Sequence, residues 1–355
     1  MTKTSLSRIP RWSTAVLAAC AALALAAAAA DKQRTVAYGN TENPPRVDPL
    51  GRCDALTLLF YPDTPCEKPA PVPADTAEQP APPAAAYPWQ IPLWEATGQV
   101  LAGEPVDTGT AWQASWHHYP AEEGATFSSL TLSLDAAPPE GSRIVAMLRP
   151  VDSDDALVLG SDDFPFEVRE TSDGLVAQAA RSLPPGRYAV VAGLAGEDGN
   201  LVPRFAGRVL IPRVAADQLR LSEVILADSL RRVGPDEPPS PFHVSGFEVV
   251  PRSSNVFHPG ESVKIFYIVL GAGGESVDVD VTYQLYLKNP ANLSAGWIRA
   301  GRPQVMAHQE GAVRAWELPI VEQFPATDYR LEIKVRDNAS GGTVNGFVEF
   351  RVEKG

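Results

Sequence analysis

Histidine is the first residue type to test for catalytic or metal chemistry in this chain of 355 residues. His117 and His118 are adjacent and would point to opposite faces of a strand, which is poor geometry for joint chelation. A zinc site built on this pair with Glu122 and Glu123 is therefore disfavoured. We expect surface or turn positions for all five histidines: His117, His118, His243, His258 and His308. Because the sequence also contains no GxSxG elbow, HExxH helix or Walker loop, we predict no catalytic residue.

The most credible ion site is an acidic cluster around a short apolar run. Acidic residues flank residues 156–159 on both sides, and a hairpin would bring the two acidic ends together. Carboxylate oxygens are the ligands that calcium prefers, but a regular twelve-residue calcium loop is missing. Solvated loop charge is the preferred interpretation, weak calcium binding is the alternative, and no other cofactor is predicted. The cluster comprises Asp152, Asp154, Asp155, Asp162 and Asp163.

Tryptophans gather at the start of the apolar part of the chain. Trp112 and Trp116 are four residues apart, so they share one face if this stretch is a strand. Packing in a core is the default interpretation of such aromatics. An exposed cluster would instead form a platform for sugar rings or a protein partner. With Trp89 and Trp94 on the rim, this platform is the best binding-site hypothesis that the sequence offers.

Short alternations of apolar and polar residues, separated by Gly, Pro, Asp and Asn, dominate the chain from Tyr87 onward. Residues 129–134 alternate with period two, as do residues 277–287. Residues 263–270 are densely apolar, as in a buried sandwich strand. Almost no run has helical spacing. The sequence therefore predicts an all-β fold.

An internal repeat divides this region into two units. Pro184 and Tyr188 recur 141 residues later as Pro325 and Tyr329. In Ig-like sandwiches, a tyrosine at the start of the penultimate strand bonds back to the preceding corner, so both tyrosines are predicted to be structural. We predict two tandem Ig-like β-sandwich domains, residues 87–214 and 242–355, joined by an inter-domain linker, residues 215–241.

Several motifs between residues 183 and 352 carry a resemblance to a known family. They are the LPPGRY corner, the bridging LRLSEVIL segment, VPR before FHPGE, and the closing FVEFRV strand. With these motifs, about half of the chain resembles the β-rich C-terminal tail of bacterial secreted proteins related to von Willebrand factor A domains. The sequence lacks the A domain itself, including its DxSxS metal-adhesion motif. The resemblance implies an exported tandem-sandwich module and transfers no activity.

The first thirty residues have the layout of a secretory signal peptide. Lys3, Arg8 and Arg11 precede an apolar, alanine-rich run at residues 13–30, and cleavage is predicted after Ala30. The alternative is a lipoprotein signal in which Cys20, within the sequence LAAC, is acylated. Ten further apolar residues follow Cys20, which disfavours this alternative.

Residues 31–86 form a polar and then Pro/Ala-rich segment. Such a composition favours extended polyproline conformation and acts as a semi-rigid spacer, and we interpret the proline-rich part as a linker. Cys53 and Cys66 are the two cysteines left after signal cleavage. In an oxidising compartment they are predicted to form a disulfide.

Charge and compartment limit the classes of function. Removal of the three basic signal residues lowers the formal net charge from −13 to −16, which opposes binding to the phosphates of nucleic acids. After processing we expect no transmembrane span, and a location in the periplasm or outside the cell. The predicted function is a non-catalytic protein of the bacterial cell envelope that binds a protein or glycan, or acts as a structural spacer. The alternative is a secreted hydrolase whose site is not recognisable from the sequence.

Overall fold

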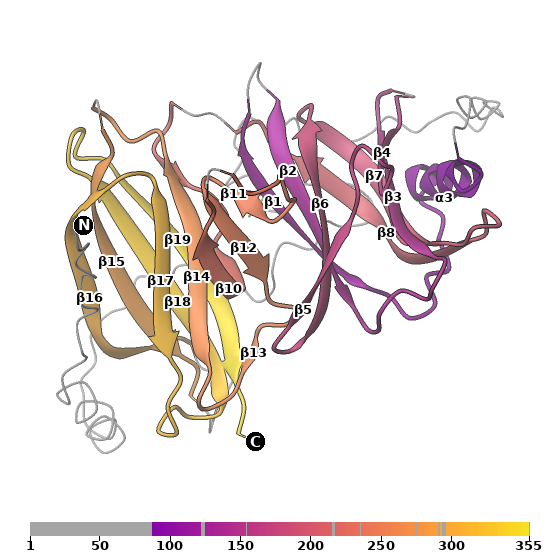
Figure 1. Ribbon diagram of the computed structural model, residues 1–355. Coiled ribbons are helices and arrows are strands. Elements are labelled where there is room, and N and C mark those ends of the chain that lie inside the picture. Colours follow the sequence, from indigo (N-terminus) through magenta and orange to yellow (C-terminus); the bar gives the residue numbers. More distant parts are fainter. Residues whose placement is uncertain are drawn as a thin grey trace, which may run out of the picture.

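The computed structural model describes residues 87–121, 125–153, 155–214, 217–234, 236–274, 276–289, 292 and 296–354. Within these residues the chain is nearly all β, with a single helix and nineteen strands (Figure 1). The predicted all-β fold is confirmed. No helix in this part of the chain is long and apolar enough to span a membrane. The predicted signal peptide and the proline-rich segment lie outside the described residues, and so do Cys20, Cys53, Cys66, Glu122, Glu123 and Asp154.

Two antiparallel sheets enclose the core of the first sandwich-like body. Its strands are β1 (Gln113–Pro120), β2 (Thr126–Leu134), β3 (Arg143–Pro150), β4 (Leu157–Leu159), β5 (Glu167–Thr171), β6 (Gly174–Leu183), β7 (Gly186–Ala195) and β8 (Leu201–Ile211). One sheet has the order β1-β2-β6-β5 and the other the order β4-β3-β7-β8. Alternating residues such as Leu130 and Leu132 of β2 meet Ile144 and Leu148 of β3 in the buried space between the sheets.

The second body has the same two-layer construction. Its strands are β9 (Arg220–Leu221), β10 (Ile225–Arg232), β11 (His243–Val244), β12 (Phe247–Pro251), β13 (Val256–Phe257), β14 (Ser262–Leu270), β15 (Asp278–Leu287), β16 (Ile298–Glu310), β17 (Val313–Pro319), β18 (Thr327–Asp337) and β19 (Thr343–Val352). One sheet has the order β11-β12-β10-β14-β17, with β9 also paired to β14, and the other has the order β13-β19-β18-β15-β16. Val263 and Ile265 of β14 pack against Val281 and Ile333 in its core.

Residues 215–241 are only partly a linker. Strands β9 and β10 lie within this segment and pair antiparallel with β14. Ile225 and Ala227 of β10 are buried, because their side chains pack in an apolar cluster with Phe266 of β14. The predicted boundary is therefore wrong, and much of this segment belongs to the second body.

The repeated tyrosines close equivalent corners in the two bodies. The hydroxyl of Tyr188 donates to the carbonyl oxygen of Pro184 at 2.7 Å, and that of Tyr329 donates to the carbonyl oxygen of Pro325 at 2.9 Å. Both rings are buried. Each bond ties the start of a strand, β7 or β18, to the loop that precedes it.

One helix, α3 (Gln90–Ala102), covers the outer face of β3 and β7 (Figure 1). Pro92 lies in its first turn, where a missing N–H leaves no helical bond unmade. Gly103 ends the helix in the left-handed conformation with φ of 79°, which glycine adopts without strain. Arg208 of β8 donates to the carbonyl oxygens of Val100 and Leu101, both at 2.9 Å. This helix is not part of the predicted all-β fold.

The two bodies contact each other through the outer faces of two sheets, and Figure 1 shows β1, β2 and β6 beside β10, β11 and β12. Tyr119 of β1 packs in one buried cluster with Phe266 and Ile268 of β14. Val176 of β6 packs against Phe242, which precedes β11. The contact between the bodies therefore has an apolar core of its own.

Candidate functional site

The predicted aromatic platform does not exist as an exposed surface. Trp89, Trp94 and Trp112 are only 4%, 5% and 6% exposed. Trp89 and Trp94 lie at the start of α3 and within it, and they cover the outer face of β3 and β7. Trp112 and the half-buried Trp116 share one face of the chain, but this face packs into the core of the first body. The binding-site hypothesis built on these four tryptophans is wrong, because three of the rings are buried in two cores and Trp116 is half-buried against one of them.

The acidic cluster does not converge on a cation site. A carboxylate oxygen of Asp155 accepts from the hydroxyl of Ser153 at 2.9 Å. Asp162 accepts from Arg143 and from the hydroxyl of Tyr87, each at 3.3 Å. The apolar run between the acidic ends is the single strand β4, which pairs antiparallel with β3, so the acidic residues lie before and after this strand. In the ranges that the structure describes, no three His, Cys, Asp or Glu side chains are grouped to hold a metal ion.

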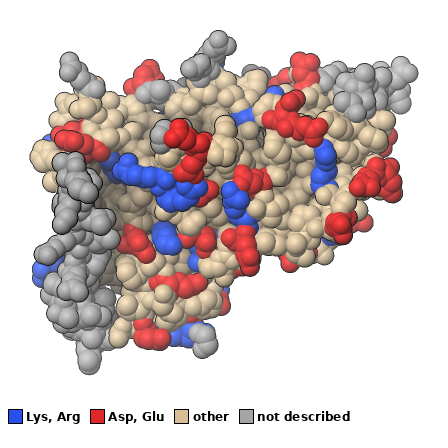
Figure 2. All heavy atoms as spheres, in the orientation of Figure 1, with Lys and Arg blue, Asp and Glu red and all other residues tan. Residues whose placement is uncertain are grey.

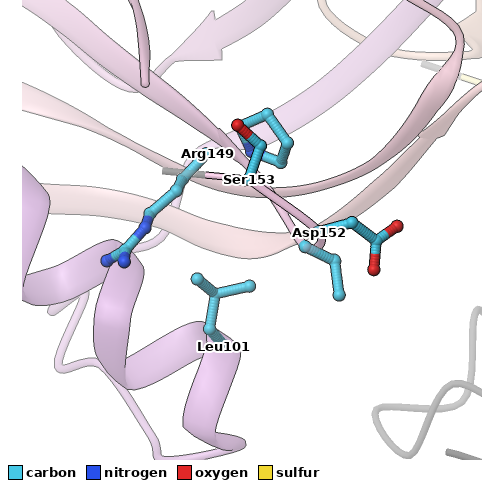
Figure 3. A pocket seen from close by; sticks show the side chains of 6 residues that line it. Leu101, Arg149, Asp152 and Ser153 are labelled. Atoms are coloured by element: carbon cyan, nitrogen blue, oxygen red, sulfur yellow. The ribbon is translucent and has the colours of Figure 1, made fainter. Parts of the chain in front are cut away.

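A small hollow of about 230 Å³ lies between the end of α3 and the loop after β3. Figure 3 shows the guanidinium of Arg149 turned toward the helix and the carboxylate of Asp152 turned away from it. The guanidinium carbon of Arg149 lies 3.8 Å from the ring centre of Trp94. The polar groups of this hollow thus point apart, and its arginine serves to pack α3 onto the sheet.

A second hollow, of about 340 Å³, lies between the two bodies. We call it the inter-body cleft. Its walls are mainly uncharged and polar on the side of the first body, and mixed polar and apolar on the side of the second. The first body contributes Gln113, Ala114, Ser115, His117 and Ser133 to its lining. The second body contributes residues 224–226 and 251–255, with Val348.

Strand β1 supplies one wall of the cleft because of its alternation. Ala114 and Trp116 pack toward the core of the first body. The odd-numbered side chains project to the opposite face, where Ser115 and His117 line the cleft. Farther along this face, Tyr119 is buried against the second body. A single strand therefore contributes to a core, a cleft and an interface.

His117 is a buried, neutral imidazole in this wall. The residue is 9% exposed, and its Nδ1 atom has no hydrogen-bond partner among the described residues. Burial lowers the pKa of His117 from 6.5 to about 4, because the charged form would lose its hydration. At neutral pH the ring can donate one hydrogen bond and accept another.

His118 lies on the other face of β1 and links the bodies through its backbone. Its amide donates to the Glu223 carboxylate at 2.7 Å, and its Nδ1 is 3.0 Å from the hydroxyl of Ser128. Burial, with smaller effects from His117 and Arg220, lowers the pKa of His118 to about 4. Glu223 is an exposed residue, but its carboxylate lies against β1, and the resulting loss of water raises its pKa to about 7.

The histidines thus divide into two groups. His117 and His118 are buried, which corrects the expectation of surface or turn positions for this pair. His258 and His308 are exposed, and His243 is half-buried. The second body contributes to this burial at the end of β1, where Glu223 bonds to the amide of His118 and Tyr119 packs with Phe266 and Ile268. The local sequence around residue 117 contains no sign of these contacts.

Charged and polar groups hold the rim of the cleft together. Arg252, whose side chain is 4% exposed, lies 3.3 Å from the Asp173 carboxylate of the first body. Asp173 also accepts from the amide of Ser254 at 2.8 Å and from its hydroxyl at 2.9 Å. Arg169 of β5 lies 3.7 Å from Glu248 of β12, and Figure 2 shows basic and acidic groups side by side near the middle of this face. These contacts join loops and strands of both bodies into one frame.

The edge of β1 is partly open beside the cleft. The strand pairs with β2 along one side, over residues 113–120. On its other side, the amide of Trp112 donates to the carbonyl oxygen of Arg204 at 2.7 Å, and that of His118 donates to Glu223. Between these two positions, the described residues provide no hydrogen-bond partner for the backbone of Ala114 or Trp116.

No family model matches the chain, and no curated protein matches it. Among solved structures, a superoxide reductase (neelaredoxin) from Ignicoccus hospitalis shares 12% identity at a TM-score of 0.19, covering 28% of this chain and 74% of that one. A DUF4785 family protein from Legionella pneumophila shares 9% identity at a TM-score of 0.20, over 64% of this chain and 52% of that one. The α2-macroglobulin of Escherichia coli shares 12% identity at a TM-score of 0.21, over 69% and 16%.

Proposed function

We propose that this protein is an exported, non-catalytic module of the cell envelope that binds a protein partner in the inter-body cleft. The observation that supports this proposal is the cleft itself, about 340 Å³ in volume and framed by both bodies. Its volume is near the lower end of the roughly 300–1,000 Å³ found for ligand pockets. The predicted role as a structural spacer is compatible with this function, since the two bodies form a joined frame.

The lining favours binding over covalent chemistry. Among the described residues of the first body, His117 is the only titratable side chain that lines the cleft, and Arg252 on the opposite wall is paired with Asp173. Serine hydroxyls and side-chain amides make up most of the remaining polar lining: Gln113, Ser115, Ser133, Ser253, Ser254 and Asn255. Such groups orient a ligand through hydrogen bonds.

We further interpret the two bodies as tandem Ig-like sandwiches. The tyrosine corners at Tyr188 and Tyr329 support this assignment, because the same hydrogen bond recurs at the same place in both bodies. We also propose that residues 183–352 are related to the β-rich tails of von Willebrand factor A-related proteins.

Export is the second part of the proposal. The basic start and alanine-rich run of residues 1–30 support it, and a disulfide between Cys53 and Cys66 would form in the same compartment. Acylation at Cys20 is the alternative route to the envelope. Cell fractionation with mass spectrometry of the mature chain distinguishes the two, because the first gives an N-terminus at Asp31 and the second an acylated peptide that begins at Cys20.

The binding function is tested by closing the cleft. The mature chain is used as bait in an envelope extract, beside Ser115→Trp, which places a large ring in the cleft at an exposed position of β1. The matched control is Val305→Trp, which adds the same ring at a position of β16 that is 63% exposed. We expect Ser115→Trp to lose a partner that the wild type and Val305→Trp both retain.

A partner retained equally by all three chains would contradict the assignment to the cleft. Thermal melts accompany the capture experiment, since Ser115→Trp has to keep the wild-type melting temperature for the comparison to hold. Should it unfold, Gln113→Trp at the neighbouring exposed position of the cleft replaces it.

A further inference from the structure

We propose that the cleft takes an extended peptide segment of its partner, which adds to the open edge of β1 as a short extra strand. This inference rests on the proposed binding function and specifies its ligand class. The occupant is a stretch of three to four residues with small, uncharged side chains, recognised mainly through its backbone.

Alternate backbone groups of β1 point away from β2, toward the open edge. In an antiparallel pair, successive residues direct their N–H and C=O groups alternately toward the partner strand and away from it. The amides of Trp112 and His118 bind Arg204 and Glu223, so both point away from β2. By this alternation, the N–H and C=O groups of Ala114 and Trp116 also point to the open side.

The spacing of these backbone groups matches the repeat of an extended peptide. Residues two apart in a strand lie about 6.6 Å apart along its axis. The backbone of an extended peptide repeats its donors and acceptors at the same interval, so it can bond to Ala114 and Trp116 in register. This match to a peptide repeat favours a protein segment over a glycan, and strand addition is a recurring mode of peptide recognition.

At both ends of the open edge, the backbone groups of the strand already have hydrogen-bond partners. Arg204 occupies the amide of Trp112 and Glu223 occupies that of His118. Pro120, the last residue of β1, has no N–H group to offer. These limits leave room for only a short added strand, of three to four residues.

The walls beside this edge are suited to small, uncharged side chains. Ala114 itself lines the cleft with Ser115 and His117. His117 is nine-tenths buried, and its Nδ1 has no partner among the residues that the structure describes, so a ligand group can complete its hydrogen bonding. Residues 224–226 form an apolar opposite wall, and the charge of Arg252 is balanced by Asp173. Small neutral side chains suit this lining.

The test uses a displayed library of random heptapeptides, selected on the full mature chain. Individual peptides are then measured by fluorescence anisotropy against the wild type, Ala114→Pro and Ala114→Ser. Proline removes the outward N–H without breaking a bond to β2, and serine keeps the N–H at the same position. We expect at least a tenfold loss of affinity for Ala114→Pro and a change below twofold for Ala114→Ser.

A second measurement covers the case in which Ala114→Pro fails to fold. Each selected peptide is resynthesised with alternate amides N-methylated, in both phases, and bound to the wild-type chain. An added strand uses amides of one phase only, so one methylated form should lose at least tenfold in affinity and the other should bind almost unchanged.

Two results would overturn the strand addition. One is a set of peptides that bind equally well to Ala114→Pro, or in both methylated forms. The other is a selection that yields no specific peptide. If an envelope partner is still lost with Ser115→Trp after either result, the binding function of the cleft survives and only the peptide mode fails. If capture is also insensitive to Ser115→Trp, both proposals fall.

Discussion

Two tyrosine hydroxyls show how a single side chain fixes the shape of a loop in this protein. Tyr329 is 1% exposed, its ring stacks on Phe350 at 5.3 Å between centres, and its hydroxyl reaches back to Pro325. Tyr188 makes the equivalent bond to Pro184 in the first body. The ring supplies apolar packing and the hydroxyl satisfies a carbonyl at the corner, so the two contributions are separable by mutation.

We predict that Tyr329→Phe lowers the unfolding free energy by about 1 kcal/mol, the usual contribution of one protein hydrogen bond, since the ring is retained. Tyr188→Phe should behave alike. Urea melts of the full chain measure the change. Tyr286→Phe is the matched control, because the hydroxyl of Tyr286 bonds to Glu332 at a half-exposed position and its removal should change stability little. Equal effects at Tyr329 and Tyr286 would argue against a structural role for the corner.

The spacing of the two tyrosines made their role predictable, whereas the surroundings of the histidines were not. Tyr188 and Tyr329 sit in similar local motifs, so the sequence itself contains the signal. His117 and His118 are buried because residues more than 100 positions later, including Glu223, lie against β1. No local pattern records a contact over that separation.

At the scale of the element, unbroken apolar strands indicate where a third layer covers a sheet. Val145 and Met147 of β3 pack under α3, while Ile144 and Leu148 of the same strand face the core. In β14, the odd-numbered residues face the second core, while Phe266, Ile268 and Leu270 pack in the cluster that contains Tyr119 of the first body. A strand that is buried on both faces has a continuous apolar sequence. The dense runs in the sequence were therefore evidence for the helix and for the contact between the bodies.

The helix was not predicted because the apolar repeat in its sequence is short and interrupted. Leu93, Trp94, Thr97 and Val100 repeat with helical spacing and are buried, but Pro92 and an internal glycine weaken the pattern. The paired signals of a proline in the first turn and Gly103 after the last would have identified its two ends. For the aromatic cluster the sequence allows both core packing, the default interpretation, and an exposed platform, because tryptophans on a helix that covers a sheet resemble an exposed group in the sequence.

We predict that Trp94→Ala lowers the unfolding free energy by about 3–5 kcal/mol, because it removes a large buried side chain and leaves a cavity under α3. The variant also exposes the sheet and removes the ring on which Arg149 stacks. Ile91→Ala in the same helix is the control, since Ile91 is 44% exposed and should change stability by less than about 0.5 kcal/mol. Similar small losses in both urea melts would show that α3 does not pack as described.

At the scale of the whole molecule, the joint between the bodies combines an apolar cluster with buried polar links. Asp173 is central among these links. Burial acts to raise the pKa of its carboxyl, but hydrogen bonds from Thr171 and Ser254, with the charge of Arg252, lower the pKa below its usual value. The carboxylate is therefore held in its charged form against the guanidinium.

We predict that Asp173→Ala lowers the unfolding free energy by about 3 kcal/mol, because it removes one of the two carboxylates beside the buried guanidinium of Arg252 and leaves only Glu261, at 3.5 Å. Small-angle scattering should also show a larger radius of gyration as the joint loosens. The control is Glu322→Ala, which removes a carboxylate that is 79% exposed and pairs only weakly with Lys354. Unchanged stability and size in Asp173→Ala would mean that the apolar cluster alone holds the bodies together.

The acid response of this joint follows from the two buried histidines. Their pKa values fall from 6.5 to about 4 on folding, so the unfolded chain binds more protons than the folded chain between these pH values. The contribution of these two histidines to the unfolding free energy is then fully present above pH 6.5 and is lost as the pH falls toward 4. Arg220 faces the same region and disfavours the protonated form of His118. Glu223 acts in the opposite sense between about pH 4.5 and 7, with an effect that its exposure to solvent reduces.

We predict that His117→Gln makes the unfolding free energy less dependent on pH between 6.5 and 4. Glutamine keeps a neutral polar side chain and removes one titrating group, so the slope should fall by up to about 1.4 kcal/mol per pH unit, the equivalent of one proton. His258→Gln is the matched control, because His258 is exposed and its removal should leave the slope unchanged. Urea melts at half-unit steps from pH 7 to pH 4 give both slopes. If the two variants have the same slope, the imidazole of His117 reaches water in the folded protein and the joint is open on that side of β1.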